Sequence, residues 1–427
     1  MRKITKLLIP AILVVAMIVS CSVMFASAAS SKTIYISATG TGTGTQTDPM
    51  GPGTVTDTVK NGAGSETFQT FTNAAYADVI SWMKANVANG KMVFTNNALA
   101  KAHPLYRAIE ALGAEGGTIV VVGDLAIDAA DAFEKSYAGD FKLPESGDIT
   151  ITGGKLVLDH STWNSTALWF GGNTTLKDIA VEYRYNSTQM TQYYEQGFSF
   201  YANGKNLTID TGVTVTSKDY SGSTPVDGDV FPNLFTTTRN GIEQTCNPVL
   251  TVKSGTWHLV SAAGHSVSSA KNSSVVGNST LNIAGGKIEF LNCAGVSPYS
   301  NRVYSEVRGD VAVNVTGGTI DTISCVTGSG ITGKLTISLD APAKVDTIVY
   351  LDTTKHQPSE PTSKAISYKA GTIDLANIDE AFVAAEITEK TVTPQTGSSI
   401  AIFSAAAVVA LAGASVVISK KRARIED

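Results

Sequence analysis

The stretch that decides the fold is an eight-residue pattern that occurs four times. It reads ITITGGKL at 149–156, LTVKSGTW at 250–257, LNIAGGKI at 281–288 and VNVTGGTI at 313–320. Apolar and polar residues alternate until a glycine restarts the alternation, which is typical of a strand, a sharp corner and a second strand. The last three copies begin 31 and 32 residues apart. A fixed corner at a near-constant period favours a solenoid of stacked strands. A β-sandwich is the alternative that stays open.

Weaker copies of the pattern extend the repeat without the paired glycines. They begin at Leu176, Leu207 and Leu335. No helical pattern of useful length separates the strands after residue 145, which argues against a doubly wound sheet with crossover helices. The sequence therefore predicts an all-β fold.

The repeat alignment also places the cysteines. Ala262, Cys293 and Cys325 each lie ten residues after an apolar strand residue of their own repeat, so stacked repeats would put them in one inward column. Side chains in such a column point the same way. We therefore expect Cys293 and Cys325, with Cys246 as a third, to be buried thiols rather than metal ligands or a disulfide.

The segment before the repeats has a recognisable order of elements. A short strand, TIYIS at 33–37, is followed by a Gly/Thr-rich loop, and residues 71–88 predict an amphipathic helix. A second helix opens at Pro104 and ends at Gly113, and GGTIVVVG at 116–123 follows as a buried strand. This order resembles the start of pectate-lyase-like proteins. The resemblance implies a right-handed parallel β-helix with an N-terminal capping helix, here with a long insertion at about 51–97.

The N-terminus has the pattern of an export signal. Basic residues precede an apolar run from Leu7 to Phe25, and small residues lead to a predicted cleavage site after Ala28. Two alternatives stay open: an uncleaved anchor helix, and lipidation of Cys21, because residues 18–21 resemble a lipobox.

The C-terminus carries the pentapeptide TPQTG at 393–397, an apolar run at 400–418 and a basic tail. The run is long enough to span a bilayer, with its basic tail on the cytoplasmic side. This arrangement resembles the cell-wall sorting signal of Gram-positive surface proteins. The resemblance implies that a sortase reads Pro394, Gln395, Thr396 and Gly397, cleaves after Thr396 and joins the chain to peptidoglycan. Thr393 departs from the usual leucine, which leaves the sortase class open, and a plain single-pass anchor is the alternative.

These features divide the chain into five expected parts. They are a signal peptide (1–28), an N-terminal cap region with a helical insertion (29–116), the β-helix (117–352), a linker or wall stalk (353–396), and the sorting signal (397–427) with its transmembrane helix (400–418).

Charge and cysteine content exclude several classes of partner. The net charge is −5, and residues 29–396 alone carry 25 basic and 35 acidic residues. An acidic exterior argues against nucleic acid and weighs against anionic polysaccharides. The four cysteines lack zinc-ligand spacing. We expect no cofactor and no metal.

Catalytic residues are hard to assign from the pattern. Asp178 and Glu182 fall in one repeat beside Arg184, but strand positions that face solvent often carry such charges. No adjacent Asp pair joins a G-H-G segment, as in pectin hydrolases, and residues 264–266 come nearest. The other candidates are Asp148, Asp159, His160 and Asp210.

The densest aromatic stretch runs from Trp163 to Tyr201. Within it, Tyr183, Arg184 and Tyr185 stand among polar residues, and we nominate them as a glycan-binding patch, because aromatic rings stack on sugars. Core filling is the alternative reading of this stretch.

The sequence thus predicts an exported, wall-anchored surface protein that acts as an adhesin or as a glycan- or protein-binding module. A polysaccharide lyase or glycoside hydrolase on the same fold is the first alternative, and a structural surface component is the second. The ligand stays undetermined, because a fold does not specify a function.

Overall fold

The structure is a computed structural model that describes residues 32–390 except 63, 65, 87–91, 128–131, 134–139, 162–166, 189–197, 240–242, 267–272, 297–304, 327–329, 352–360 and 384–385. Contacts divide the chain into two units, 1–388 and 389–427. Only Glu389 and Lys390 of the second unit are described. The signal, the sorting motif and the 400–418 run lie outside the described residues.

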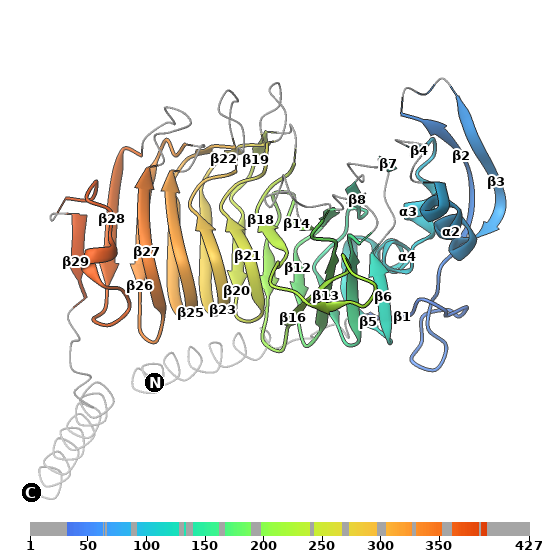
Figure 1. Cartoon of the computed structure of the whole chain (residues 1–427), viewed down its shortest axis with the longest axis horizontal. Coiled ribbons are helices and arrows are strands. Elements are labelled where there is room, and N and C mark those ends of the chain that lie inside the picture. Colours follow the sequence, from blue (N-terminus) through green and yellow to red (C-terminus); the bar gives the residue numbers. More distant parts are fainter. Residues whose placement is uncertain are drawn as a thin grey trace, which may run out of the picture. The chain divides into compact units, whose positions relative to one another are not determined.

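The described residues lie mostly in β-strands, and most strands pair in parallel, which confirms the all-β prediction. One continuous row, row 1, contains ten strands in the order of the sequence (Figure 1). Its members are β1 (Thr33–Ile36), β5 (Gly117–Val121), β9 (Ile149–Thr152), β12 (Thr174–Leu176), β15 (Leu207–Ile209), β20 (Val249–Val252), the first parts of β23 (Ser279–Asn292) and β25 (Val311–Val326), β26 (Lys334–Leu339) and β28 (Ser363–Tyr368).

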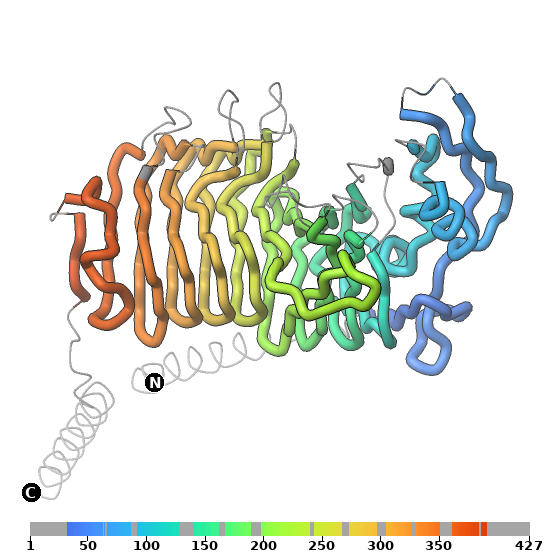
Figure 2. Tube along the Cα trace, in the orientation of Figure 1, coloured from blue at the N-terminus to red at the C-terminus, as the bar shows by residue number. Residues whose placement is uncertain are grey.

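Two further rows are built from the same repeats. Row 2 contains β6 (Asp124–Ile127), β10 (Lys155–Asp159), β13 (Ala180–Tyr185) and β16 (Thr214–Asp219), to which β17 (Val226–Asp227) adds antiparallel. Row 3 contains β8 (Asp140–Lys142), β11 (Ala167–Trp169), β14 (Ser199–Tyr201), β18 (Asn233–Phe235), β21 (Thr256–Ser261), the later parts of β23 and β25, and β27 (Lys344–Leu351). A small parallel sheet joins β19 (Gln244–Thr245), β22 (Val275–Val276) and β24 (Val307–Arg308). Successive repeats therefore lie side by side (Figure 2).

Side-chain amides and carboxylates hold the repeats in register just before row 1. At each of these turns, an Asn or Asp oxygen accepts a hydrogen bond from a backbone N–H of the next repeat. The acceptor and donor pairs are Asn173 with Asn206 (2.9 Å), Asn206 with Val249 (3.0 Å), Asn247 with Asn278 (2.9 Å), Asn278 with Asp310 (2.9 Å) and Asp310 with Lys334 (2.8 Å). In each of these repeats the side-chain oxygen thus pairs with a backbone N–H that the turn would otherwise leave unpaired.

The paired glycines form the corner after row 1, as predicted. Gly286 and Gly318 have φ of 82° and 81°. A β-carbon on Gly318 would lie 2.6 Å from the carbonyl oxygen of Gly286, so the corners stack too closely for any side chain. β23 and β25 continue through these corners with register shifts at Ala284.

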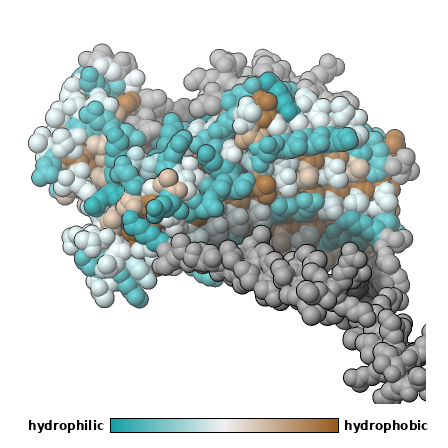
Figure 3. All heavy atoms as spheres, turned by 180° about the vertical axis from the view of Figure 1, so that it is seen from behind, coloured by the Kyte–Doolittle hydropathy of each residue, from teal (hydrophilic) through white to brown (hydrophobic). Residues whose placement is uncertain are grey.

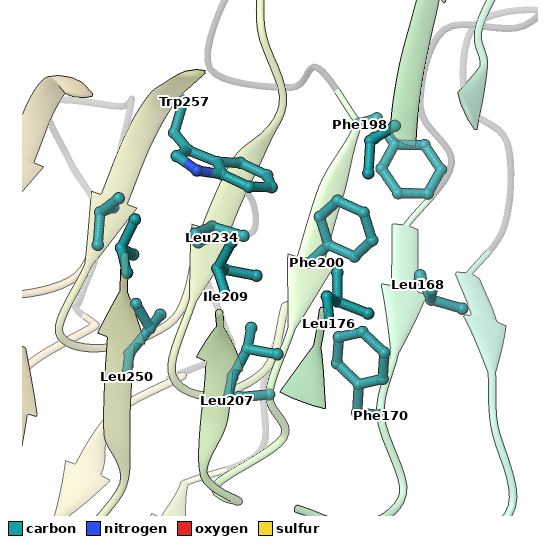
Figure 4. Packing of buried hydrophobic residues seen from close by; sticks show 14 of the residues in the cluster. Leu168, Phe170, Leu176, Phe198, Phe200, Leu207, Ile209, Leu234, Leu250 and Trp257 are labelled. Carbon is teal, nitrogen blue, oxygen red and sulfur yellow. The ribbon is translucent and has the colours of Figure 1, made fainter. Parts of the chain in front are cut away.

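The interior between the rows is filled by the apolar residues of the alternating pattern. Leu176, Leu207 and Ile209 from row 1 meet Phe200 and Leu234 from row 3, and all five are fully buried (Figure 4). Ala262, Cys293 and Cys325 are fully buried as well, and both cysteines are free thiols, as predicted. Cys246 is also a free thiol but is only half-buried, so the prediction of a third buried thiol is wrong. Burial, followed by contact with Cys293, raises the pKa of the Cys325 thiol, which keeps it protonated.

The N-terminal insertion differs from the prediction. Residues 71–75 are not helical, because they end strand β3 (Thr67–Ala75), and the helix α2 begins only at Tyr76 (Tyr76–Asn86). β3 belongs to an antiparallel sheet with β2 (Thr54–Asn61), β4 (Met92–Phe94) and β7 (Ala132–Phe133). Phe71 packs edge-on against Trp82 of α2 at 5.3 Å, and this tertiary contact favours the strand. The insertion is therefore mixed rather than helical.

The capping helix follows the prediction. α4 (Pro104–Leu112) begins with proline, buries Leu105, Ala108, Ile109 and Leu112, and ends at Gly113, which has a φ of 62°. The short helix α3 (Ala98–Ala102) precedes it, and η2 (Gly113–Glu115) leads into β5.

The predicted linker at 353–396 is partly ordered structure. β28 pairs with β26, so row 1 continues past residue 352. Ile366, Ile373 and Phe382 are buried in the core, and η4 (Leu375–Asn377) follows; the last described strand is β29 (Ile387–Glu389). The Pro- and Lys-containing composition of this segment favoured the linker interpretation. Among the described residues, no helix is long and apolar enough to cross a membrane.

Replacing Leu281 by alanine should lower the free energy of unfolding by about 2–5 kcal/mol, because the side chain is fully buried between rows. Thr280→Ala, one position away on the outer side, should change it by less than about 0.5 kcal/mol. Urea unfolding followed by circular dichroism measures both. Equal losses in the two variants would contradict the assigned direction of these side chains.

Candidate functional site

Tyr183, Arg184 and Tyr185, the nominated glycan-binding residues, do not form a surface patch. Tyr183 and Tyr185 are 0% and 3% exposed, and β13 turns both side chains inward. The Tyr183 hydroxyl lies 3.3 Å from Nδ1 of His160, inside the core, where burial raises the pKa of the phenol. A glycan cannot reach these rings without displacing the core. The polar neighbours of the two tyrosines misled the prediction, because alternation along a strand puts them on the opposite face.

Only Arg184 of the nominated residues faces outward. Its Nε donates to Oε1 of Glu182 at 2.6 Å, and Nζ of Lys155 donates to Oε2 of the same carboxylate at 3.0 Å. Lys155 also pairs with Asp124 at 2.9 Å. These four residues form a ladder of alternating charge across the outer side of row 2.

The electrostatics of Glu182 suit an ion pair rather than acid–base catalysis. Burial opposes its ionisation, but the hydrogen bonds from Arg184 and Lys155 outweigh burial and lower the pKa of the carboxyl. A general acid at neutral pH needs the opposite shift.

The other nominated carboxylates are spread among separate turns and strand ends. Asp178 is in the left-handed region, with φ of 46°, at a corner. Asp148 accepts from Asn173 (3.0 Å), Asp159 accepts from the backbone of Ser161 (3.0 Å), and Asp210 pairs with Lys253 (3.0 Å). The structure thus does not bring them together. In the described part of the chain, no three His, Cys, Asp or Glu side chains are grouped so as to hold a metal ion.

An aromatic cluster on the outer side of row 3 joins Trp169 and Tyr201, from the densest aromatic stretch, to Phe235 and His265, a grouping that the sequence analysis did not single out. Trp169, Tyr201 and Phe235 stack with ring centroids 5.3 and 4.9 Å apart, and His265 continues the stack at 5.7 Å. All four are at most 6% exposed, and burial lowers the pKa of His265 to about 3, so the imidazole is neutral. The recurring triplets ALW, SFY and NLF, each the whole of one strand, are the signal that could have found it. Its burial marks it as packing.

The outer side of row 1 presents a continuous polar column. One residue from each of the ten strands is paired in register with the next, and none is charged. From first to last the column contains Thr33, Thr118, Thr150, Thr175, Thr208, Thr251, Asn282, Asn314, Ser338 and Ser367. Parallel strands lie about 4.8 Å apart, so the column extends for about 43 Å.

The side chains of the polar column are accessible to solvent. Thr33 is exposed and the other nine are partly exposed, because each lies between neighbours of the same column. Nδ2 of Asn314 donates to Oδ1 of Asn282 at 3.0 Å, so the amides continue the column as a hydrogen-bonded ladder. Seen from behind the view of Figure 1, the surface shows brown apolar groups among teal and white residues (Figure 3).

Charges flank the polar column but neutralise one another. Lys253 pairs with Asp210 at 3.0 Å, and Lys369 pairs with Asp340 at 3.4 Å, each between neighbouring repeats. The column could have been recognised in the sequence, since the central Thr or Asn of ITI, LTI, LTV, LNI and VNV occupies it.

Comparison with known proteins identifies one end of the chain. Residues 393–427 match the family model described as the LPXTG cell wall anchor motif. This is a cell-wall-anchored surface protein of the Gram-positive type. The motif implies sortase processing and attachment to peptidoglycan. No curated protein and no solved structure matches the chain of this surface protein.

Glu182→Gln should reduce the free energy of unfolding by about 1–2 kcal/mol at neutral pH, because the amide cannot replace the charge that Lys155 and Arg184 contact. The folded-state pKa of Glu182 is lowered, so its stabilisation is present above the unfolded-state pKa and is lost as pH falls through the folded value.

The difference in the free energy of unfolding between the wild type and the Glu182→Gln variant should therefore shrink as pH is lowered through the acid range. Denaturant titrations across that range, with the exposed Glu145→Gln as control, measure it. A difference that stays constant with pH would show that the ion pair is not its source.

Proposed function

We propose that this surface protein presents a right-handed β-helix on the cell wall and binds a neutral, linear glycan along its polar column. The observation that carries the proposal is the column itself: ten uncharged hydrogen-bonding side chains in register on one face. Sugar hydroxyls donate and accept, as do Thr, Ser and Asn side chains. A linear polymer meets such a periodic surface with many weak contacts that add up.

The charges of the chain support a neutral ligand. Residues 29–396 have ten more acidic than basic residues, which would repel an anionic polysaccharide. The ion pairs beside the column, Lys253 with Asp210 and Lys369 with Asp340, each combine one positive and one negative charge.

The parallel rows support the β-helix. Rows 1, 2 and 3 recur in the same order from β5 to β18, and rows 1 and 3 recur from β20 to β27, with Asn or Asp turns before row 1 and glycine corners after it. A connection between parallel strands is almost always right-handed.

The ends of the chain deliver this domain to the wall. The signal peptide is removed after Ala28, and the 400–418 run holds the chain in the membrane until a sortase acts at Pro394, Gln395, Thr396 and Gly397. Cleavage after Thr396 then links the chain to peptidoglycan.

Thr396→Ala should abolish covalent attachment, because Thr396 supplies the acyl group that the sortase transfers. In wall fractions digested with a muralytic enzyme, the variant should be lost and should appear in the detergent-soluble membrane fraction. Ser398→Ala, just past the cleavage site, is the control and should be processed normally. Unchanged wall attachment of the Thr396 variant would contradict the assigned cleavage site.

The triple variant Thr175→Val, Thr208→Val, Thr251→Val tests binding at the polar column. Valine keeps the shape of threonine and removes the hydroxyl, so affinity for a bound glycan should fall by about tenfold or more. Cells displaying either protein are tested for retention of soluble neutral glucans, mannan and xylan, with polygalacturonate as the anionic comparison.

The matched control is Thr214→Val with Thr216→Val, since both residues are exposed on row 2, away from the column. Binding of neutral glycans that the triple variant loses and the control keeps would support the proposal. Equal binding by both, or a preference for polygalacturonate, would refute it. Product release from any glycan would favour the enzyme instead.

A further inference from the structure

The outermost strand of the N-terminal insertion has an unpaired edge. The antiparallel sheet has the order β3-β2-β4-β7, and in the described part of the chain β3 pairs only with β2 (Figure 1). An edge strand presents unpaired backbone N–H and C=O groups to any strand that approaches it.

β3 lacks the charged residues and the proline that often protect an exposed edge. Its sequence, TFQTFTNAA, contains no charged residue and no proline. Proteins commonly place lysine, proline or inward charges on such edges to prevent pairing between molecules. Register shifts interrupt its pairing with β2 near Val55 and Val59, but residues 69–71 pair without interruption. Threonine and phenylalanine there are strong strand formers.

The rest of the insertion holds this edge in place. Phe71 packs against Trp82 of α2 at 5.3 Å. On the same face of the sheet, the buried carboxylate of Asp57 in β2, which is paired in register with Phe71, accepts from the hydroxyl of Thr95 (2.8 Å) and from the backbone N–H groups of Asn96 (3.0 Å) and Ala98 (2.9 Å). These bonds fix the sheet to the start of α3. A preformed edge loses little conformational entropy when it pairs.

We propose that β3 pairs antiparallel with β3 of a second copy of this chain, so that neighbouring copies on the wall associate through this edge. A two-fold axis makes the edge its own partner, because each residue then faces an equivalent position on the other copy. An uncharged strand has no like charges to oppose at any register, and Thr–Thr pairs across strands are favourable. Anchoring to one wall raises the effective concentration of copies, which favours weak pairing between them. The inference is independent of glycan binding.

Cysteine cross-linking of the full chain on the wall of a Gram-positive host tests the pairing. Thr67, Thr70 and Thr72 are exposed on β3 and are replaced by cysteine one at a time. After mild oxidation and wall digestion, at least one variant should run mainly as a disulfide-linked dimer. Thr336→Cys, exposed on β26, is the control for random collision on a crowded wall. Wild-type protein controls for the native cysteines.

Introduced charges of opposite sign distinguish a loss of pairing between copies from a folding defect. In the best-linking cysteine variant, the other two threonines are changed to Glu in one strain and to Lys in a second. In each strain the amount of disulfide-linked dimer should fall at least about tenfold, because like charges then meet across the two-fold axis. Cells that make both variants together should recover it, since opposite charges face each other.

Three results would overturn the proposal. One is cross-linking at β3 no stronger than at Thr336→Cys. Another is loss in both charged strains without recovery when they are combined. The third is a disulfide from β3 to a different protein in place of the dimer, which would assign the edge to an extended segment of another partner.

Discussion

Parallel pairing in register is the constraint on which the rest of this structure depends. Each side chain of one repeat lies directly between its equivalents in the repeats before and after, about 4.8 Å away. A residue is therefore acceptable only if it tolerates a near-identical neighbour on both sides. Apolar residues satisfy this inside the rows, where they bury one another. Charged residues satisfy it when their signs alternate, as in Asp124 and Lys155.

The same constraint explains the corners and turns. Gly286 and Gly318 adopt a positive φ and approach the preceding corner too closely for a β-carbon. Before row 1, the amides of Asn206 and Asn278 reach the next repeat and satisfy its backbone. Stacking thus selects the turn residues as strictly as it selects the core. It also produces the polar column, because threonine and asparagine can be repeated at close spacing without electrostatic cost.

The N-terminal insertion follows another rule, and this has consequences for its surface. Its strands are antiparallel and do not repeat, and among the residues that the structure describes no equivalent strand pairs with the outer edge of β3. Long-range contacts, Phe71 with Trp82 and Asp57 with Asn96, determine its shape. Residues 71–75, which belong to a segment with a helical period, form the end of a strand because these contacts outweigh local propensity. The repeats and the insertion therefore offer two different kinds of surface: a long polar face and a short free edge.

The sequence by itself determined the repeat, the all-β class, the capping helix at Pro104, the inward cysteines and the wall-anchoring motif. These follow from local patterns: alternation, glycine corners, helix-end residues and a short peptide that an enzyme reads. Only the tertiary structure decided which residues of a strand face outward together. Tyr183 and Tyr185 proved to be core residues, while ten threonines, asparagines and serines from ten strands became one column. Facing direction depends on the registers of strands 24 to 85 residues apart, and no single segment contains that information.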